Sequence, residues 1–206
     1  MFFPIRTDRR LAHTPWVNYT LIAVNVLVFI LQIALSSPGR PQWFGHGLLD
    51  PEAPSLHQFI TYQFLHGSWE HLLGNMLFLY VFGNSVEDRL GKIGYLGFYL
   101  AGGVIAGFGH ALLETTPVLG ASGAICAVTG AYLALFPLSG VTIFYWFVFY
   151  VGTFEVSGIV LICFQIAQDL LFQLAGRGGV AYMAHLAGYA YGLLIGMGLL
   201  WCRLLA

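Results

Sequence analysis

Five stretches of the chain are apolar over a length that can cross a membrane. They cover residues 17–35, 71–86, 93–113, 119–136 and 180–200; residues 67–70 extend the second, and Pro137 ends the fourth. A spanning helix needs about 20 mostly apolar residues. The pattern therefore predicts a bundle of transmembrane helices.

The stretch from residue 141 to residue 174 is ambiguous. Glu155 divides it, and residues 141–151 are too few to cross a bilayer unaided. They are also β-branched and aromatic, which favours an extended or interfacial segment. We therefore predict one span here, over residues 156–174, and leave the conformation of residues 141–155 open. The predicted fold is an all-α polytopic membrane protein of six transmembrane helices, with a short segment over residues 1–16 and one domain over residues 17–206.

The composition agrees with this class. Of 206 residues, 58% are hydrophobic and 8% are charged, against about 25% charged in a soluble domain. The net charge of −1 and the scattered basic residues give no phosphate-binding stripe, so no nucleic-acid partner is expected. Cys126, Cys163 and Cys202 lie apart in apolar runs, with no pair that suggests a disulfide or a zinc site.

The basic residues set the predicted orientation. With six spans both termini share one side, and only Arg40 and Arg177 fall on the other side. Six basic residues lie with the termini: Arg6, Arg9, Arg10, Arg89, Lys92 and Arg203. Lys and Arg favour the cytoplasmic side, so we predict cytoplasmic termini. Residues 36–70 then form an outer loop, whose prolines and aromatic residues indicate a structured element. The short basic N-terminus favours the bacterial inner membrane, with an organelle as the alternative.

Polar side chains from three predicted helices lie at one depth in the membrane. His71 and Asn75 begin the second span, Ser122 begins the fourth and His185 begins the sixth. Each lies within a few residues of its outer end, at about 1.5 Å of rise per residue. The spans thus bring these four side chains to one level that opens to the outside.

Small residues predict that the fourth and sixth spans pack closely. Ala184, Gly188, Gly192 and Gly196 recur every four residues, and the fourth span offers a matching series: Gly120, Gly123, Ala127, Gly130, Ala131 and Ala134. Such stripes let helix backbones approach in lipid, which would make Ser122 and His185 neighbours. The alternative is that the stripes only hold helix to helix.

The four polar residues suit acyl transfer. A serine hydroxyl needs a base within about 2.6–3.2 Å, and donors must face the developing oxyanion. His71 and Asn75 share one helix face at spacing i, i+4 and can both donate. Alternatively, Ser122 bonds its own helix, or His185 is a proton relay or binds a metal with His66 and His71. Because no His-Glu-x-x-His motif is present, we expect no metal and no cofactor.

The chain resembles the rhomboid intramembrane serine proteases. The resemblance covers nearly all of it, from residue 17 to residue 200. It is carried by HGSWEHLLGN at residues 66–75, GNSVEDRLG at 83–91, GASG at 120–123 and AHLAGYAYG at 184–192. A lone Gly-x-Ser-Gly is weak evidence, but the four motifs in this order are specific.

The resemblance implies a six-helix rhomboid-like bundle and a role for each matching residue. Ser122 is the nucleophile and His185 the general base, a dyad without an acidic third member. His71 and Asn75 bind the oxyanion together with backbone N–H groups near Ser122. The implied structural residues are Gly123, Gly188 and Gly192, which pack the helices, and Glu87 at the cytoplasmic end of the second span.

The implied substrates are the transmembrane segments of other proteins. They are cut where helix-destabilising residues near the outer face expose a peptide carbonyl, and they enter from the lipid bilayer beside the fifth span. The rival interpretation is a catalytically silent relative that binds membrane clients; such relatives usually lack the serine or the histidine. A transporter is a third alternative, for which the inner halves of spans two and six offer little.

The sequence departs from the family pattern at two sites. His57-Gln58 stands where some members have Trp-Arg. Cys126 stands where some members have a tyrosine that stacks on the catalytic histidine, so any such support for His185 must come from elsewhere. Asp169, the only acid well inside a span, has no assigned role.

Overall fold

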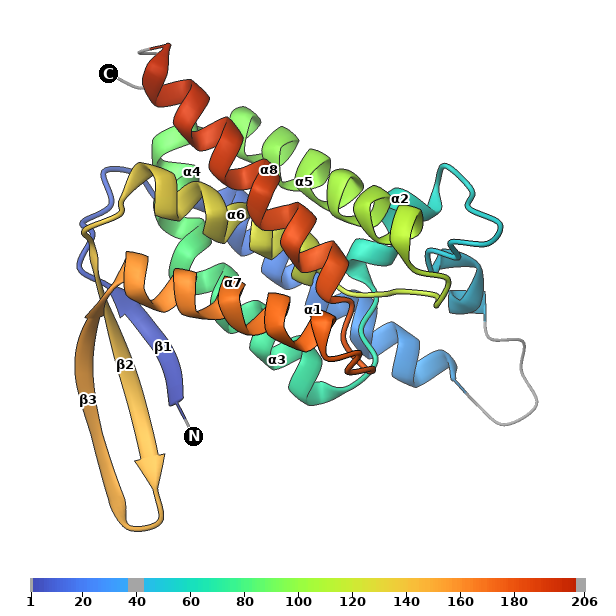
Figure 1. Ribbon diagram of the computed structural model, residues 1–206, viewed down its shortest axis with the longest axis horizontal. Helices are drawn as coiled ribbons and strands as arrows, with labels where there is room; N and C mark the ends of the chain where they lie inside the picture. The colour runs from blue at the N-terminus through green and yellow to red at the C-terminus, as the bar shows by residue number, and fades with distance from the viewer. Residues whose placement is uncertain (1, 37–42, 203–206) are drawn as a thin grey trace.

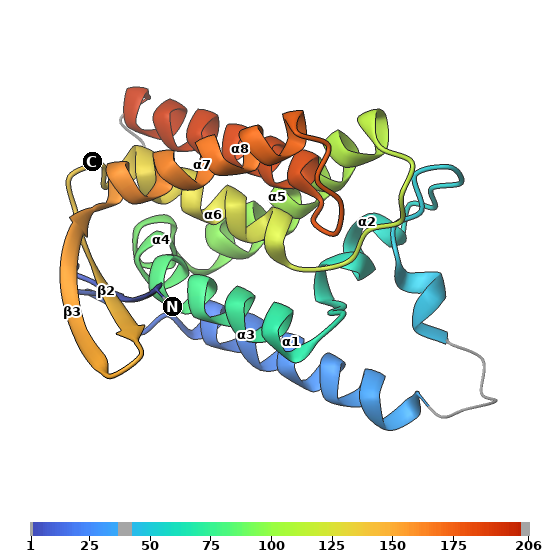
Figure 2. The same cartoon turned by 60° about the horizontal axis from the view of Figure 1, so that its bottom comes forward.

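The computed structural model describes residues 2–36 and 43–202 as a helical bundle with a small sheet at one end (Figures 1 and 2). Every predicted span coincides with a helical segment. These segments are α1 (Trp16–Leu35), α3 (Trp69–Phe78) continued by the π-helical η3 (Leu79–Gly83) and α4 (Asn84–Leu90), α5 (Lys92–Leu113), α6 (Ser122–Leu135), α7 (Gly158–Leu174) and α8 (Tyr182–Trp201).

Three helices in the described part of the chain are long and apolar enough to cross a membrane by length and composition. They are α1, α5 and α8, whereas α6 and α7 are shorter apolar helices. The structure thus supports a mostly helical membrane protein, and by this criterion it supports fewer crossings than the six predicted. As predicted, one helix, α7, lies between Pro137 and Gly176.

Helix α6 is the centre of the bundle. Every residue from Gly123 to Leu133 is buried, because α8, α5, α7 and the α3–α4 segment all pack around it. Its amino end begins three residues later than predicted, and Pro137 follows closely on its carboxyl end at Leu135. Small side chains predominate along α6, which lets its neighbours approach closely.

The all-α prediction is wrong, because the structure contains a three-stranded antiparallel sheet. Its order is β1 (Phe2–Thr7), β2 (Gly140–Phe147), β3 (Tyr150–Ser157). Residues 141–151, for which the sequence favours an extended or interfacial segment, form β2 and the start of β3, with a turn at Val148 and Phe149. Val141 and Ile143 are buried in the main core and fix β2 against the helices. Strand β1 makes the N-terminal segment part of the fold.

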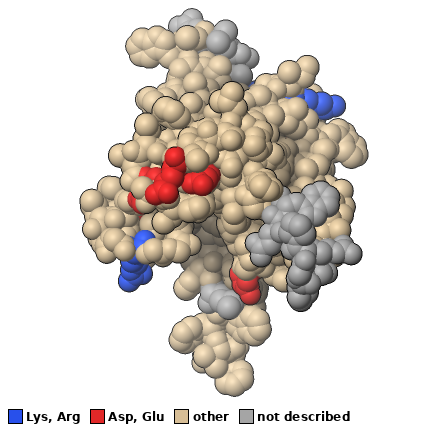
Figure 3. All heavy atoms as spheres, turned by 90° about the vertical axis from the view of Figure 1, so that its right-hand side faces the viewer, with Lys and Arg blue, Asp and Glu red and all other residues tan. Residues whose placement is uncertain are grey.

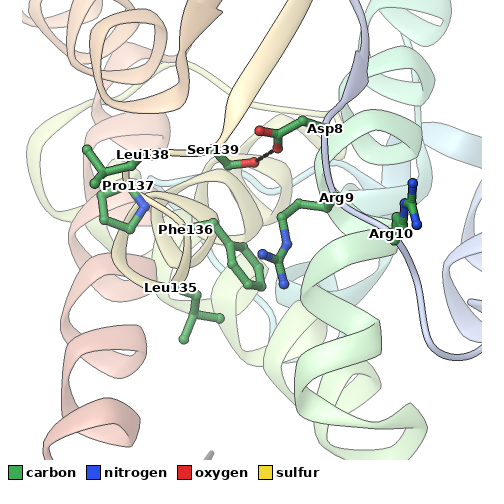
Figure 4. Close-up of a pocket in the computed structure, with 8 residues that line it drawn as sticks. All are labelled: Asp8, Arg9, Arg10, Leu135, Phe136, Pro137, Leu138 and Ser139. Carbon is green, nitrogen blue, oxygen red and sulfur yellow. Dashed lines mark hydrogen bonds between the residues drawn. The ribbon is translucent and has the colours of Figure 1, made fainter.

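Residues just after β1 fasten the sheet to the carboxyl end of α6. The Asp8 carboxylate accepts hydrogen bonds from the Ser139 hydroxyl and, at 2.8 Å, from the Gly140 N–H. The Arg9 guanidinium lies 4.5 Å from the ring centre of Phe136. These side chains line a surface cavity of about 640 Å³, whose remaining lining residues are Arg10, Leu135, Pro137 and Leu138 (Figure 4).

The π-helical turn of η3 frees a backbone carbonyl that a buried asparagine uses. A π turn shifts the helical hydrogen-bond register, and here the Asn18 amide donates to the Leu79 carbonyl at 2.9 Å and to Asn84 Oδ1 at 2.8 Å. Asn18 in turn accepts from the Tyr95 hydroxyl at 2.6 Å. This network joins α1, η3, α4 and α5 inside an otherwise apolar core.

The segment before α3 is structured, as the loop prediction expected. It contains η1 (Trp43–Gly47), α2 (Gln58–Thr61) and η2 (Tyr62–Phe64), while residues 37–42, with Pro38, Arg40 and Pro41, lie outside the described residues. Leu49 bridges to Val118, and the Tyr62 hydroxyl donates to the Gly103 carbonyl at 2.6 Å. Figure 3 views this side, where uncharged residues predominate and acidic side chains appear as one cluster and a second, separate spot.

Candidate active site

Ser122 is the first residue of α6 and is half-buried. The chain reaches it through Gly120, whose φ of +127° is a conformation that L side chains rarely adopt. The Gly120 N–H donates to the Tyr62 carbonyl at 2.9 Å, which holds the turn in place. The first N–H groups of a helix have no partner within that helix. The turn therefore presents a hydroxyl beside unpaired backbone donors.

His71 and Asn75 lie against this turn. A Cβ on Gly120 would lie 2.8 Å from His71 Nε2 and 3.8 Å from Asn75 Nδ2. Both side chains come from the start of α3, where the Ser68 hydroxyl caps the helix by accepting from the His71 N–H at 3.2 Å. The side-chain nitrogens predicted to bind an oxyanion thus face the backbone immediately before Ser122.

A buried histidine orients Asn75. Asn75 Nδ2 lies 3.0 Å from His66 Nε2, and the His66 and His71 rings are in edge contact with centres 5.2 Å apart. His66 is 2% exposed. Because an amide group carries two hydrogens, Asn75 can donate one to His66 and keep the second. His66 enters the sequence prediction only as a metal ligand, and its contact with Asn75 was not foreseen.

His185 lies in the first turn of α8, where Asp169 of α7 faces it. His185 Nδ1 is 3.0 Å from Asp169 Oδ2, with the two side chains 15% and 13% exposed. The Tyr182 ring also contacts the imidazole edge-on, with centres 6.4 Å apart. These contacts were missed because they join two helices whose relative rotation cannot be read from either one alone. The only indication of this contact in the sequence was that Asp169, an acidic residue, lies inside an apolar span.

The small-residue stripes of α6 and α8 face one another. A Cβ on Gly188 would lie 2.3 Å from the Gly123 carbonyl oxygen, and a Cβ on Gly192 would lie 1.9 Å from that of Ala127. The backbones therefore touch directly next to Ser122 and one turn after His185. Among the described residues no hydrogen bond joins Ser122 to His185, whose ring uses Nδ1 for Asp169 and leaves Nε2 free.

Glu87 lies at the far end of the α3–α4 segment and caps α1. Its carboxylate accepts from the Val17 N–H at 3.1 Å and from the Asn18 N–H at 2.6 Å. Glu87 is 3% exposed. A carboxylate at a helix amino end satisfies orphan donors and matches the helix dipole. Glu87 therefore has a structural role and lies outside the candidate site.

The two departures from the family pattern have distinct surroundings. Cys126 is buried between α6 and α8, and its Cβ would lie 3.1 Å from a Cβ on Gly188. It therefore supplies no ring to His185. His57 Nε2 lies 3.1 Å from the His46 carbonyl, and Gln58 accepts from the Ser55 N–H at 3.0 Å. Both residues therefore make hydrogen bonds within the segment before α3.

Neither a candidate metal cluster nor the cavity beside Asp8 includes Ser122. Within residues 2–36 and 43–202, no group of three or more His, Cys, Asp or Glu side chains is arranged to hold a metal ion. The cavity beside Asp8 lies at the opposite end of α6 and includes none of the predicted catalytic residues (Figure 4).

Comparison with known proteins decides the family. A family model described as the rhomboid domain matches residues 53–202. The chain belongs to the rhomboid family. This rhomboid is 30% identical over 154 residues to Rhomboid-like protein 11, chloroplastic, of Arabidopsis thaliana, a match that covers 72% of this chain and 52% of that protein.

Two further relatives have similar coverage. RHOMBOID-like protein 12, mitochondrial, of Arabidopsis thaliana is 28% identical over 189 residues, covering 82% of this chain and 54% of the relative. The human presenilin-associated rhomboid-like protein, mitochondrial, is 29% identical over 179 residues, covering 84% and 45%. This rhomboid thus spans about half the length of these relatives. Their names refer to chloroplasts and mitochondria, so they give no support to a bacterial inner membrane.

Proposed function

We propose that this rhomboid is an intramembrane serine endopeptidase with Ser122 as nucleophile and His185 as general base. The observation that carries the proposal is the junction of α6 with α8, where glycine contacts hold the Ser122 turn beside the first turn of α8. The ring nitrogen of His185 that faces away from Asp169 is the proton acceptor. Family membership supports the same reaction.

The proposed reaction proceeds in two steps. Ser122 Oγ bonds to the peptide carbonyl carbon while its proton passes to His185 Nε2. The tetrahedral intermediate then expels the amine, which takes the proton from His185. Water next attacks the acyl-enzyme and loses a proton to His185, and the second tetrahedral intermediate then expels Ser122 Oγ, which takes that proton back from His185. These steps use side chains, backbone groups and water, so no cofactor is required.

The oxyanion is stabilised from two sides. His71 and Asn75 donate from α3, and N–H groups of the first turn of α6 donate from the backbone. Such donors act strongly where water is scarce, since the dielectric there is low. The contact between Asn75 and His66 supports this role, because it fixes the amide before substrate arrives.

The proposed substrates are transmembrane segments with helix-destabilising residues near the outer face. A hydrogen-bonded helix hides its carbonyls, so a segment must unwind before Ser122 can attack. Helix α7 suits lateral entry because, of its seventeen residues, only Gly158 and Ile162 are buried. We place both termini on the cytoplasmic side, so that the site opens outward.

Labelling with a serine-directed fluorophosphonate tests the proposal. The purified protein should take up label at Ser122 and cut a reporter transmembrane substrate. Ser122→Ala should abolish both, and His185→Ala should reduce both. Ser55→Ala, which alters an exposed loop serine, should leave both unchanged. A folded protein that neither labels nor cuts, yet retains membrane clients, would instead support the client-binding alternative.

A further inference from the structure

Asp169 is the only charged residue of α7, and its carboxylate points at the proposed base rather than at water. Oδ2 lies 3.0 Å from His185 Nδ1, and the side chain is 13% exposed. A charge inside an apolar helix is costly and is retained where it has a partner or a function. The proposed mechanism assigns Asp169 no part.

The geometry points to Asp169 as a positioning residue that holds His185 in the tautomer and orientation required by Ser122. This inference rests on the proposed function. A carboxylate at Nδ1 accepts the Nδ1–H, which leaves Nε2 unprotonated and able to accept the serine proton. It also stabilises the imidazolium that forms during attack.

The cysteine at position 126 explains why His185 uses a carboxylate as its partner. Cys126 offers no ring to stack on the imidazole, and Tyr182 meets it only edge-on, at 6.4 Å and 86°. An edge contact restrains the ring but does not select the nitrogen that carries the proton. The hydrogen bond to Asp169 does both.

A simple tether between α7 and α8 explains the contact less well. The same end of α7 is already held by Gln173, which donates to Glu114 at 2.7 Å, and by Phe172, whose ring meets that of Tyr182 at 5.8 Å. These two contacts hold this end of α7 without Asp169, and neither uses the imidazole of His185. Of the three α7 residues, Asp169, Phe172 and Gln173, only Asp169 contacts the imidazole in the structure.

The test compares Asp169→Asn and Asp169→Ala with Gln173→Ala in the full-length protein. Cleavage of a reporter transmembrane substrate gives kcat and KM, and fluorophosphonate labelling reports activation of Ser122 without substrate entry. We expect both Asp169 variants to lower kcat and the labelling rate at least about tenfold with KM little changed. This loss is below the roughly 10⁴-fold cost of Asp→Asn in a soluble triad, because Tyr182 still contacts the ring. Asp169→Glu should recover part of the loss.

The control separates positioning from tethering. Gln173→Ala should leave kcat and the labelling rate near the parent values, and all variants should keep their melting temperature within a few degrees. Asp169→Asn with kcat within about twofold of the parent would overturn the inference, as would an equal loss in Gln173→Ala. If the parent protein itself takes no label at Ser122, the proposed function fails, and this inference fails with it.

Discussion

Replacing Gly192 by alanine is expected to push α8 away from α6. The added Cβ would lie 1.9 Å from the Ala127 carbonyl oxygen, and ordinary contact begins at 3.4 Å. The atom it meets belongs to the backbone and cannot rotate aside, so the helices must separate locally by about 1.5 Å. Overpacking of this kind costs about 1–3 kcal/mol. It outweighs the gain of about 1 kcal/mol that alanine brings to a helix interior.

The same shift should reach the proposed site. Gly192 lies two turns from His185, about 10 Å along α8, and a displacement of about 1 Å at reacting groups can cost about 100-fold in rate. We therefore expect Gly192→Ala to lose about 100-fold in kcat/KM for a reporter substrate, together with a lower melting temperature.

A graded series on one helix helps test this reasoning. At Gly196 the added Cβ would lie 2.8 Å from the Ala134 methyl group, and at Gly198 it would meet nothing within 4 Å. The loss of activity and stability should thus fall in the order Gly192→Ala, Gly196→Ala, Gly198→Ala, with the last near the parent protein. A Gly192→Ala protein that melts and cleaves like Gly198→Ala would refute the argument from packing.

Three further predictions concern single polar contacts. Glu87→Ala should lower the free energy of unfolding by about 1–3 kcal/mol, because it removes the acceptor of one buried and one part-buried N–H group of α1; thermal unfolding in detergent measures this. Asn75→Ala should lower kcat more than it raises KM, by up to about 100–1,000-fold, while the protein still takes up fluorophosphonate. Hydrogen bonds from the Ser139 hydroxyl, and next from the Gly140 N–H, hold the pKa of Asp8 below its ordinary value. Asp8→Asn should therefore lower the melting temperature at pH 7, and the difference should shrink as the pH falls below about 4 and vanish only below the depressed pKa of Asp8.

Each of these predictions has a contradicting outcome. Glu87→Gln keeps one side-chain oxygen and should lose less stability than Glu87→Ala; equal losses would show that the charge, not the acceptor, stabilises α1. Equal loss of activity in Asn75→Ala and Ser122→Ala would give Asn75 a mainly structural role. An Asp8→Asn effect that grows on acidification would have the wrong sign, because a carboxylate with a depressed pKa stabilises the fold only while it is ionised.

The apolar runs predicted where the helices lie because hydropathy is a local property. The β-branched and aromatic content of residues 141–151, which favoured an extended or interfacial segment, is likewise a local property. The pairing of β2 with β3 was missed because its turn, at Val148 and Phe149, carries none of the Gly or Asn residues typical of hairpins, and Val148 has a φ of +53°. Strand β1 was missed because its partner lies far along the chain.

The candidate site likewise contains residues whose placement the sequence predicted and contacts that it did not. Counting residues from the helix ends was enough to predict that His71 and Asn75 lie close to Ser122 in depth, because depth in a membrane follows from position in a span. The contacts of His185 with Asp169 and of Asn75 with His66 depend on how helices rotate and on which side chain bridges them. No local pattern carries that information.

The pairing of β1 with β2 has a consequence for how the protein is made. Arg6 and Thr142, which touch across this pair, are 136 residues apart in the chain. Strand β1 is therefore synthesised long before its partner and has no strand to pair with until α1, α3, α5 and α6 have all followed. Closing so long a loop yields no contacts until its ends meet. The sheet therefore forms only after the helices between its first two strands have been made, and α7 and α8 then follow it along the chain.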